Sequence, residues 1–241
     1  MANLKHAVAL GVMALALASC DQMAGDPGAT IERNILDTPG QEELWLTIKQ
    51  EYPRDFAQLV SEIESLQPSQ RRDNAIIERL GAEWLQGFFA TISPDAVRAP
   101  APQLLAWSEA EHALYASLQD GAVSQCARLT MGDWITVDPE DAAITAAIAR
   151  RNAAMVRSAS AGRQSPVEYA DPAEDALRQL GNAIAQTGLD PQLQASLGST
   201  EAMEALDAAQ QCEVGVAVYA GLTALPDDAE PLMAAYMLAP K

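Results

Sequence analysis

The residues Glu109-Ala110-Glu111-His112 hold the spacing with the most chemical meaning in the chain. On a helix Glu109 and His112 would share one face, as the Glu-x-x-His elements of di-iron carboxylate bundles do. Such a site needs this element twice, yet the chain has only 2 histidines, and the other is His6 near its start. We therefore interpret His112 as a polar helix residue, and the sequence predicts neither a metal site nor a cofactor.

Other catalytic arrangements lack the residues that they need. No Gly-x-Ser-x-Gly turn presents a serine to His112, and no His-Glu-x-x-His or Cys-x-x-Cys supplies zinc ligands. No glycine-rich phosphate loop occurs either. Only Lys49 and Lys241 follow the first twenty residues, and the absence of Ser-x-x-Lys excludes penicillin-binding chemistry. The sequence predicts no catalytic residue and a protein that is not an enzyme.

One enzyme class stays open as an alternative, because it works with a single carboxylate. In lytic transglycosylases, which act on the cell wall, one glutamate has a pKa raised by burial. In that family the glutamate is followed by Ser and later by a Gly-Leu-Met-Gln-like stretch. Glu64-Ser65 has the first feature, but nothing after it matches the second. We interpret Glu64 as a solvated residue on the flank of its helix.

The charge of the chain excludes further classes of function. The sequence has 33 Asp+Glu against 15 Lys+Arg and a net charge of −18. This sign excludes nucleic-acid binding by phosphate neutralisation, and it disfavours electrostatic binding to anionic lipids. Three acidic clusters could suggest calcium, but none has the Asp-x-Asp-x-Asp-Gly spacing of a calcium loop. The clusters are Asp138, Glu140 and Asp141; Asp171, Glu174 and Asp175; and Asp227, Asp228 and Glu230.

The first twenty residues contain a targeting signal. Lys5 precedes an apolar run from 7 to 17, too short for a permanent membrane span, and Leu17-Ala18-Ser19-Cys20 follows it. This tetrapeptide resembles the lipobox of bacterial lipoproteins. The resemblance implies that residues 1–19 are a cleaved signal peptide, that Cys20 carries lipid, and that the protein is membrane-anchored on the periplasmic side. In enteric bacteria an Asp after the lipidated Cys retains lipoproteins in the inner membrane, so Asp21 favours that membrane.

The two remaining cysteines are expected in an oxidising compartment. Cys126 and Cys212 form an even set once Cys20 is lipidated, and we predict a disulfide between them. In the chain-entropy view such a bridge stabilises the fold by about 4–5 kcal/mol. Two buried free thiols are one alternative. A nucleophilic cysteine assisted by His112 is another.

Repeated helix-start signals organise the rest of the chain. Each places a capping oxygen before the first turn, in most cases followed by a proline whose missing N–H is not needed there. Between the signals, apolar residues recur at helical spacing. Pro53 should kink or restart a helix, and Ser93-Pro94 should end one. Residues 200–225 should form one long helix, whereas residues 158–169 should form a loop. The starts lie at Thr38-Pro39, Asp138-Pro139, Asp171-Pro172, Asp190-Pro191 and Ser199.

Abundant alanine, 5% aromatic residues and the lack of sustained strand alternation predict an all-α fold. We expect a single globular domain over residues 38–241, with about seven to nine helices in an orthogonal or irregular bundle. Residues 20–37 are polar, contain Gly25, Pro27 and Gly28, and are expected to form a flexible lipidated tether.

These features favour a non-enzymatic membrane-anchored lipoprotein with a role in protein interaction or envelope maintenance. An interface could include Trp84, Phe88 and Phe89, or the Met-containing residues 232–237, although core packing is the simpler use of both. Besides the cell-wall enzyme, a helical small-molecule binder remains an alternative. The sequence does not identify the envelope partner, a ligand or an oligomeric state.

Overall fold

The structure, a computed structural model, describes residues 27–133, 135 and 141–239, and within these ranges it is all-helical. The described residues form twelve α-helices and one 3-10 helix, η1, and no strand. The all-α prediction is confirmed, and the predicted number of helices is too low. In chain order the helices are α1 Pro27–Leu36, α2 Glu42–Glu51, α3 Pro53–Ser65, η1 Gln70–Arg72, α4 Asn74–Ala96, α5 Ala101–Gly121, α6 Val123–Thr130, α7 Ala142–Gln164, α8 Glu174–Gln186, α9 Pro191–Ser196, α10 Thr200–Glu204, α11 Ala208–Thr223 and α12 Glu230–Leu238.

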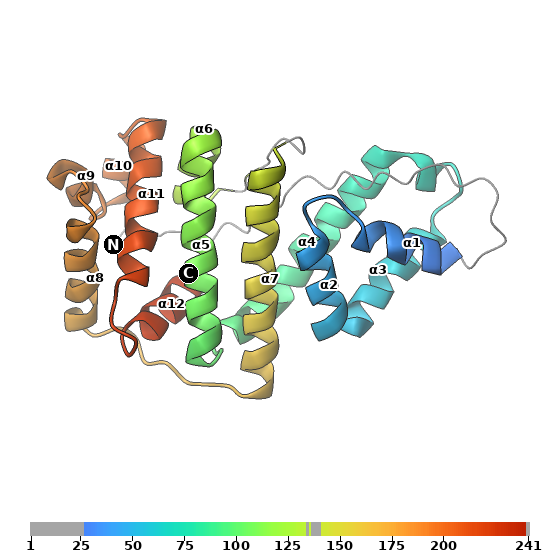
Figure 1. The fold of residues 1–241 in the computed structure, drawn as a ribbon, viewed down its shortest axis with the longest axis horizontal. Coiled ribbons are helices and arrows are strands. Elements are labelled where there is room, and N and C mark those ends of the chain that lie inside the picture. Colours follow the sequence, from blue (N-terminus) through green and yellow to red (C-terminus); the bar gives the residue numbers. More distant parts are fainter. Residues whose placement is uncertain (1–26, 134, 136–140, 240–241) are drawn as a thin grey trace.

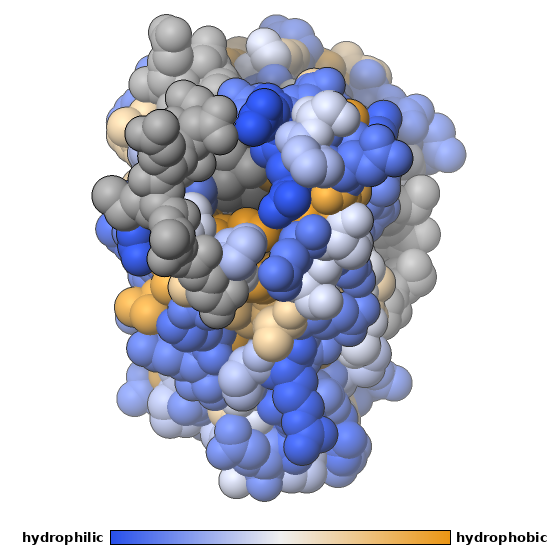
Figure 2. Space-filling view, turned by 90° about the vertical axis from the view of Figure 1, so that its right-hand side faces the viewer, coloured by the Kyte–Doolittle hydropathy of each residue, from blue (hydrophilic) through white to orange (hydrophobic). Residues whose placement is uncertain are grey.

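Helices α8, α11, α5 and α7 stand side by side in the middle and at one end of the molecule (Figure 1). Helix α7 packs against α5 on one side and against α2 and α4 on the other. Helices α1, α2, α3 and η1 form the opposite end, and α12 crosses beneath α11 and α5 (Figure 1). Viewed from the α1 end, the surface is mostly hydrophilic, with apolar residues gathered near its middle (Figure 2). One apolar core runs from Ile31 on α1 to Leu238 on α12 and includes residues of every described α-helix, but none of η1.

Helix α1 corrects the predicted tether. Residues 27–36 are helical, and Ile31 and Ile35 are buried because their i, i+4 spacing gives the helix an apolar edge that packs against α3. The side chain of Glu32 also accepts a hydrogen bond from Lys49 Nζ on α2 at 2.7 Å. Within the described residues the folded domain therefore begins at Pro27 rather than at residue 38. The remaining tether residues, 20–26, lie outside the described part of the chain.

Proline has opposite effects at two positions. As predicted, Pro53 restarts a helix: α2 ends at Glu51, and α3 begins with the proline in its first turn. Pro94, however, does not end α4, which continues to Ala96. The carbonyl of Ala90, which loses its usual N–H partner at Pro94, accepts a hydrogen bond from the hydroxyl of Ser93 at 3.3 Å. The Ser93 hydroxyl takes the place of the missing N–H donor, so the helix continues and the predicted break at Ser93-Pro94 is wrong.

Two further boundaries differ from the prediction. The expected long helix over 200–225 is divided into α10 and α11, because Asp207 caps a new helix in a capping box with Gln210. The expected loop at 158–169 is helical as far as Gln164, and the exposed connection to α8 starts at Ser165. Gly162 is needed in this helix because a Cβ there would lie 2.0 Å from the carbonyl oxygen of Asp95 at the end of α4. The glycine thus allows α7 and α4 to approach closely.

Candidate functional site

A fully buried ion pair lies between the two central helices. Arg151 on α7 donates a hydrogen bond from Nε to Oε2 of Glu111 on α5, and each side chain is only 2% exposed. Nη1 of Arg151 also donates to Oδ1 of the neighbouring Asn152 at 3.0 Å. Because two charges inside a protein lose their hydration, they are tolerated there only when paired and hydrogen-bonded in this way.

The positions of the pair in its helices explain how the charges enter the core. Glu111 lies in an apolar series that repeats at three and four residues, and Arg151 lies in a similar series on α7. Both residues therefore point inward with their apolar neighbours. The series are Leu104, Trp107, Glu111, Leu114 and Leu118 on α5, and Ile144, Ile148, Arg151 and Met155 on α7, all of them buried.

Two buried tyrosines lie close enough to the pair to interact with its charges. Tyr115 on α5 and Tyr219 on α11 stack with their ring centroids 4.8 Å apart, and Trp107 meets Tyr219 edge-on at 6.2 Å. Burial raises the pKa of both phenols well above the ordinary value, and the negative charge of Glu111 raises each further. For Tyr115, a hydrogen bond with the hydroxyl of Thr130 opposes this change in pKa. Both phenols remain protonated at physiological pH, so they do not act as bases.

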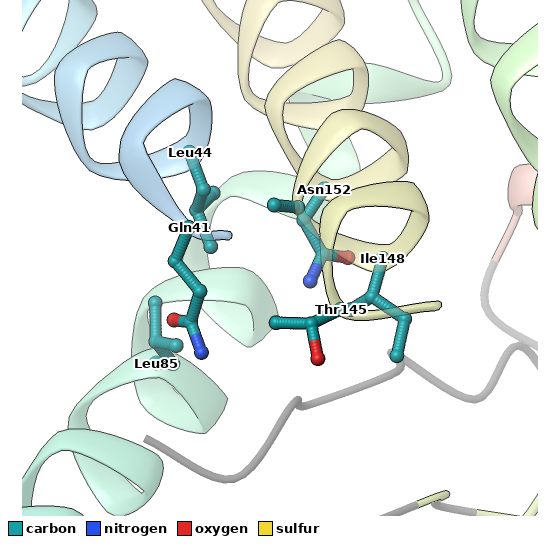
Figure 3. A pocket seen from close by; sticks show the side chains of 7 residues that line it. Gln41, Leu44, Leu85, Thr145, Ile148 and Asn152 are labelled. Atoms are coloured by element: carbon teal, nitrogen blue, oxygen red, sulfur yellow. The ribbon is translucent and has the colours of Figure 1, made fainter. Parts of the chain in front are cut away.

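A small cavity adjoins this polar centre at the junction of α2, α4 and α7. Gln41, Thr145 and Asn152 extend polar side chains toward it (Figure 3), while apolar side chains complete its wall. The volume available to the centre of a water molecule is about 10 Å³, roughly the space that one water requires. Thr145 Oγ1 is buried here without a hydrogen-bond partner. The apolar lining residues are Leu44, Leu85, Ile148 and Ala149.

The cavity and the ion pair form one polar path through the core, because Asn152 belongs to both. The path runs from Glu111 through Arg151 to Asn152, whose side chain lines the same cavity as Thr145. A cavity of this size holds a water molecule but not a metabolite. We therefore interpret the path as a polar core that fixes how α5 and α7 face each other.

The two predicted disulfide partners are joined. Cys126 on α6 and Cys212 on α11 are bonded, with their Cα atoms 5.0 Å apart and a sequence separation of 86. Both residues are buried, so the bond lies inside the domain. The prediction of the pair is confirmed, and the alternatives of free buried thiols and a cysteine nucleophile are wrong for this structure.

The remaining sequence candidates are dispersed. Glu109 is exposed on α5, His112 is half-buried beside it, and Glu64 is exposed on α3. No group of His, Cys, Asp or Glu with a metal-binding arrangement occurs among the described residues. Asp141 caps α7 by accepting from the backbone N–H of Ile144, whereas Asp138 and Glu140 lie outside the described ranges.

The two suggested interfaces belong mostly to the core. Phe88 and Phe89 are buried, and Trp84 is half-buried with its ring stacked on that of Phe88 at 5.0 Å. In the 232–237 segment, Met233 and Met237 are buried. The predicted lipidation site Cys20, Asp21 and the signal peptide 1–19 lie outside the described residues.

The sequence analysis did not identify the Glu111–Arg151 pair. The signal was present: each is a charged residue at an apolar position of its helical series, and the two charges have opposite sign.

Comparison of the chain with known protein families, curated proteins and solved structures finds no match. Among the described helices, none combines the length and apolar composition required to cross a membrane.

Proposed function

We propose that this protein is a lipid-anchored, non-enzymatic lipoprotein of the bacterial envelope, whose helical domain binds another envelope protein on the periplasmic side. The observation that carries the proposal is the tetrapeptide Leu17-Ala18-Ser19-Cys20 behind a short apolar run. Two or three acyl chains on Cys20 hold a protein stably on a bilayer, whereas a single chain binds only marginally.

The disulfide supports the proposed compartment. Disulfides persist in oxidising compartments such as the periplasm and are rare in the cytosol, where thiols are kept reduced. Cys126 and Cys212 are bonded to each other, which leaves Cys20 as the remaining cysteine of the chain. This distribution is what a lipoprotein with one modified thiol requires.

The cavity described above favours recognition through the outer surface. The cavity at Thr145 fits about one water molecule, and the Glu111–Arg151 pair is shielded from solvent. We therefore expect a protein partner to contact exposed helix faces. An anchor that confines the domain to the plane of the membrane favours such an encounter.

Metabolic labelling with a radioactive fatty acid tests the anchor. The wild-type protein should incorporate label and fractionate with membranes, and Cys20→Ser should do neither. Ser19→Ala is the matched control, because it changes the neighbouring residue but keeps Cys20 and a small residue before it. An unlabelled wild type would contradict the proposal.

Cross-linking in intact cells followed by affinity purification tests the partner. The wild type should capture a defined envelope protein, and Cys20→Ser should lose it if co-localisation at the membrane is required. Density separation of the membranes tests the inner-membrane location that Asp21 favours. Turnover of cell-wall fragments by the purified domain would contradict a non-enzymatic role.

A further inference from the structure

Helix α12 carries one charged residue on a surface that is otherwise apolar. Seven of its nine residues are buried, and Glu230 is the charged one among them. The helix packs against α5, α11 and α4, and it crosses beneath α11 and α5 (Figure 1). An exposed turn, residues 226–228, joins it to α11. No helix follows it among the described residues, so its release would displace none of the others.

The carboxyl group of Glu230 is buried at the start of this helix, where its side chain is only 7% exposed. Among the described residues, the hydroxyl of Ser108 on α5 is the one side-chain donor to this carboxyl. Ser108 has a single hydrogen, which it shares with the carbonyl oxygen of Leu105 at 2.9 Å. An ionised carboxylate with so little hydrogen bonding is costly to keep in the core.

The charges that act on this carboxyl are negative. They belong to Glu109 on α5 and to Asp227 in the turn before α12. Further titratable residues on the helices that pack against α12 do not shift its pKa. These include Glu111, paired with Arg151, and His112 on α5, Glu213 on α11, and Asp95 near the end of α4. No positive charge of the described residues therefore compensates an ionised Glu230.

The docked and released states of α12 differ in how tightly they bind a proton. Burial raises the pKa of Glu230 above 4.5 in the docked state, the hydrogen bond from Ser108 opposes this change, and Glu109 and Asp227 raise the pKa further. In the released state the carboxyl meets water and has its ordinary pKa. Release therefore gives up a proton, so the opening constant is unchanged below the ordinary pKa, rises with pH, and levels off above the docked pKa.

We propose that α12 is a pH-sensitive latch, which stays docked on α5 and α11 while Glu230 is protonated and opens more often once Glu230 is ionised. Opening is local, because the disulfide between α6 and α11 and the Glu111–Arg151 pair hold the rest of the domain together. It exposes the apolar side of α12, including Met233 and Met237, whose flexible side chains suit adaptable binding. The latch thus makes the exposure of an apolar surface depend on pH.

Hydrogen exchange measured by mass spectrometry tests the latch in the purified protein. Amides of α12 exchange when the helix opens, so their protection factors report the opening constant. Wild type is compared with Glu230→Gln, which stays neutral at every pH. Glu201→Gln is the matched control, because Glu201 is an exposed glutamate in the first turn of α10.

We expect wild type and Glu230→Gln to protect α12 equally at about pH 4. Towards about pH 8 the wild type should lose protection relative to Glu230→Gln, by about tenfold for each unit by which docking raises the pKa. Glu201→Gln should behave as the wild type. At the higher pH, α12 should also be at least several-fold less protected than the middle of α5 and α7. A difference that does not change with pH would overturn the latch, and so would equal protection of α12 and the central helices, because α12 would then open only when the whole domain unfolds.

Ser108→Ala keeps the test decisive if Glu230→Gln does not fold. This variant removes the hydrogen bond that favours the ionised carboxyl, so it should raise the docked pKa of Glu230 and increase the pH dependence of α12 opening. A pH dependence equal to or weaker than that of the wild type would contradict the proposal.

Discussion

Ser108 on α5 lies within hydrogen-bond distance of Glu230 on α12, 122 residues further along the chain. The same hydroxyl also lies 2.9 Å from the carbonyl oxygen of Leu105. A serine has one hydrogen to donate, so Oε1 of Glu230 and the carbonyl oxygen of Leu105 share it. The hydrogen bond from Ser108 lowers the pKa of the Glu230 carboxyl, whereas burial raises it.

The first prediction concerns pH. Burial raises the pKa of Glu230 above 4.5, the hydrogen bond from Ser108 opposes this change, and the negative charges of Glu109 and Asp227 raise the pKa further. Because the pKa of Glu230 is higher in the folded state than in the unfolded chain, protonation of its carboxyl stabilises the fold. This stabilisation is complete below the unfolded pKa and is lost as pH rises through the folded pKa. Glu230→Gln should therefore raise the free energy of unfolding by about 1 kcal/mol at pH 7. Urea denaturation should show this gain disappearing below about pH 4; a constant difference would contradict it.

The second prediction concerns the buried ion pair. Glu111→Leu leaves Arg151 charged and without its carboxylate in the core, and it should cost about 3–5 kcal/mol. The double variant Glu111→Leu/Arg151→Met should be markedly more stable than this single variant. Glu43→Leu is the control, because its ion pair with Arg157 at 3.0 Å is exposed and should contribute no more than about 1 kcal/mol. A double variant less stable than Glu111→Leu would contradict the reasoning.

The third prediction concerns the disulfide. Cys126→Ser and Cys212→Ser should each lower stability by up to about 4–5 kcal/mol, because each opens the same long loop in the unfolded chain. The double variant should cost little more than either single variant, since one bond cannot be lost twice. Thermal unfolding with and without reductant provides the measurement. Additive losses would show that the two cysteines act through separate contacts.

The fourth prediction compares two glycines. Gly162→Ala would place a methyl group 2.0 Å from a backbone oxygen of α4, and should cost about 1–3 kcal/mol. Gly87→Ala, at an exposed helical position with nothing within 4 Å of the new Cβ, should instead stabilise by roughly 0.5–1 kcal/mol. Melting temperatures that move in the same direction for both variants would contradict the close approach of α7 and α4.

The fifth prediction concerns the cavity. Thr145→Val replaces a buried hydroxyl that has no partner with a methyl group of similar size. If the cavity is dry, the variant should gain about 1 kcal/mol, because an unsatisfied polar group is removed. Chemical denaturation of the variant measures the change. A loss of stability would show that a bound water satisfies Thr145 in the cavity.

Local signals predicted much of the secondary structure. Asp190 and Ser199 each accept a backbone N–H at the start of a helix, as predicted. Three predicted starts are displaced: α7 is capped by Asp141 rather than Asp138, α2 begins after Gln41 rather than Thr38, and α8 begins after Ala173 rather than Asp171. Pro94 shows the limit of such signals: a proline normally ends a helix, but one serine hydroxyl compensates for its missing N–H. That compensation depends on side-chain geometry, which a sequence pattern does not contain.

The polar core was harder to predict, because it depends on which helices become neighbours. Glu111 and Arg151 each interrupt an apolar series, so each could be identified as a buried charge. Their pairing required α5 to pack against α7, and no local pattern specifies that contact. Helix α1 was missed for a related reason: its two isoleucines make a narrow apolar edge that is stable only against α3.

The 86-residue separation of the disulfide partners constrains the order of events as the chain is made. A polypeptide that emerges from its N-terminus presents Cys126 long before Cys212. Until α11 has been made, Cys126 lacks its partner. Helices α1 to α4 precede both cysteines, so the part of the domain that they form can fold before the bond exists. The disulfide therefore closes late, on a chain most of which has already been made.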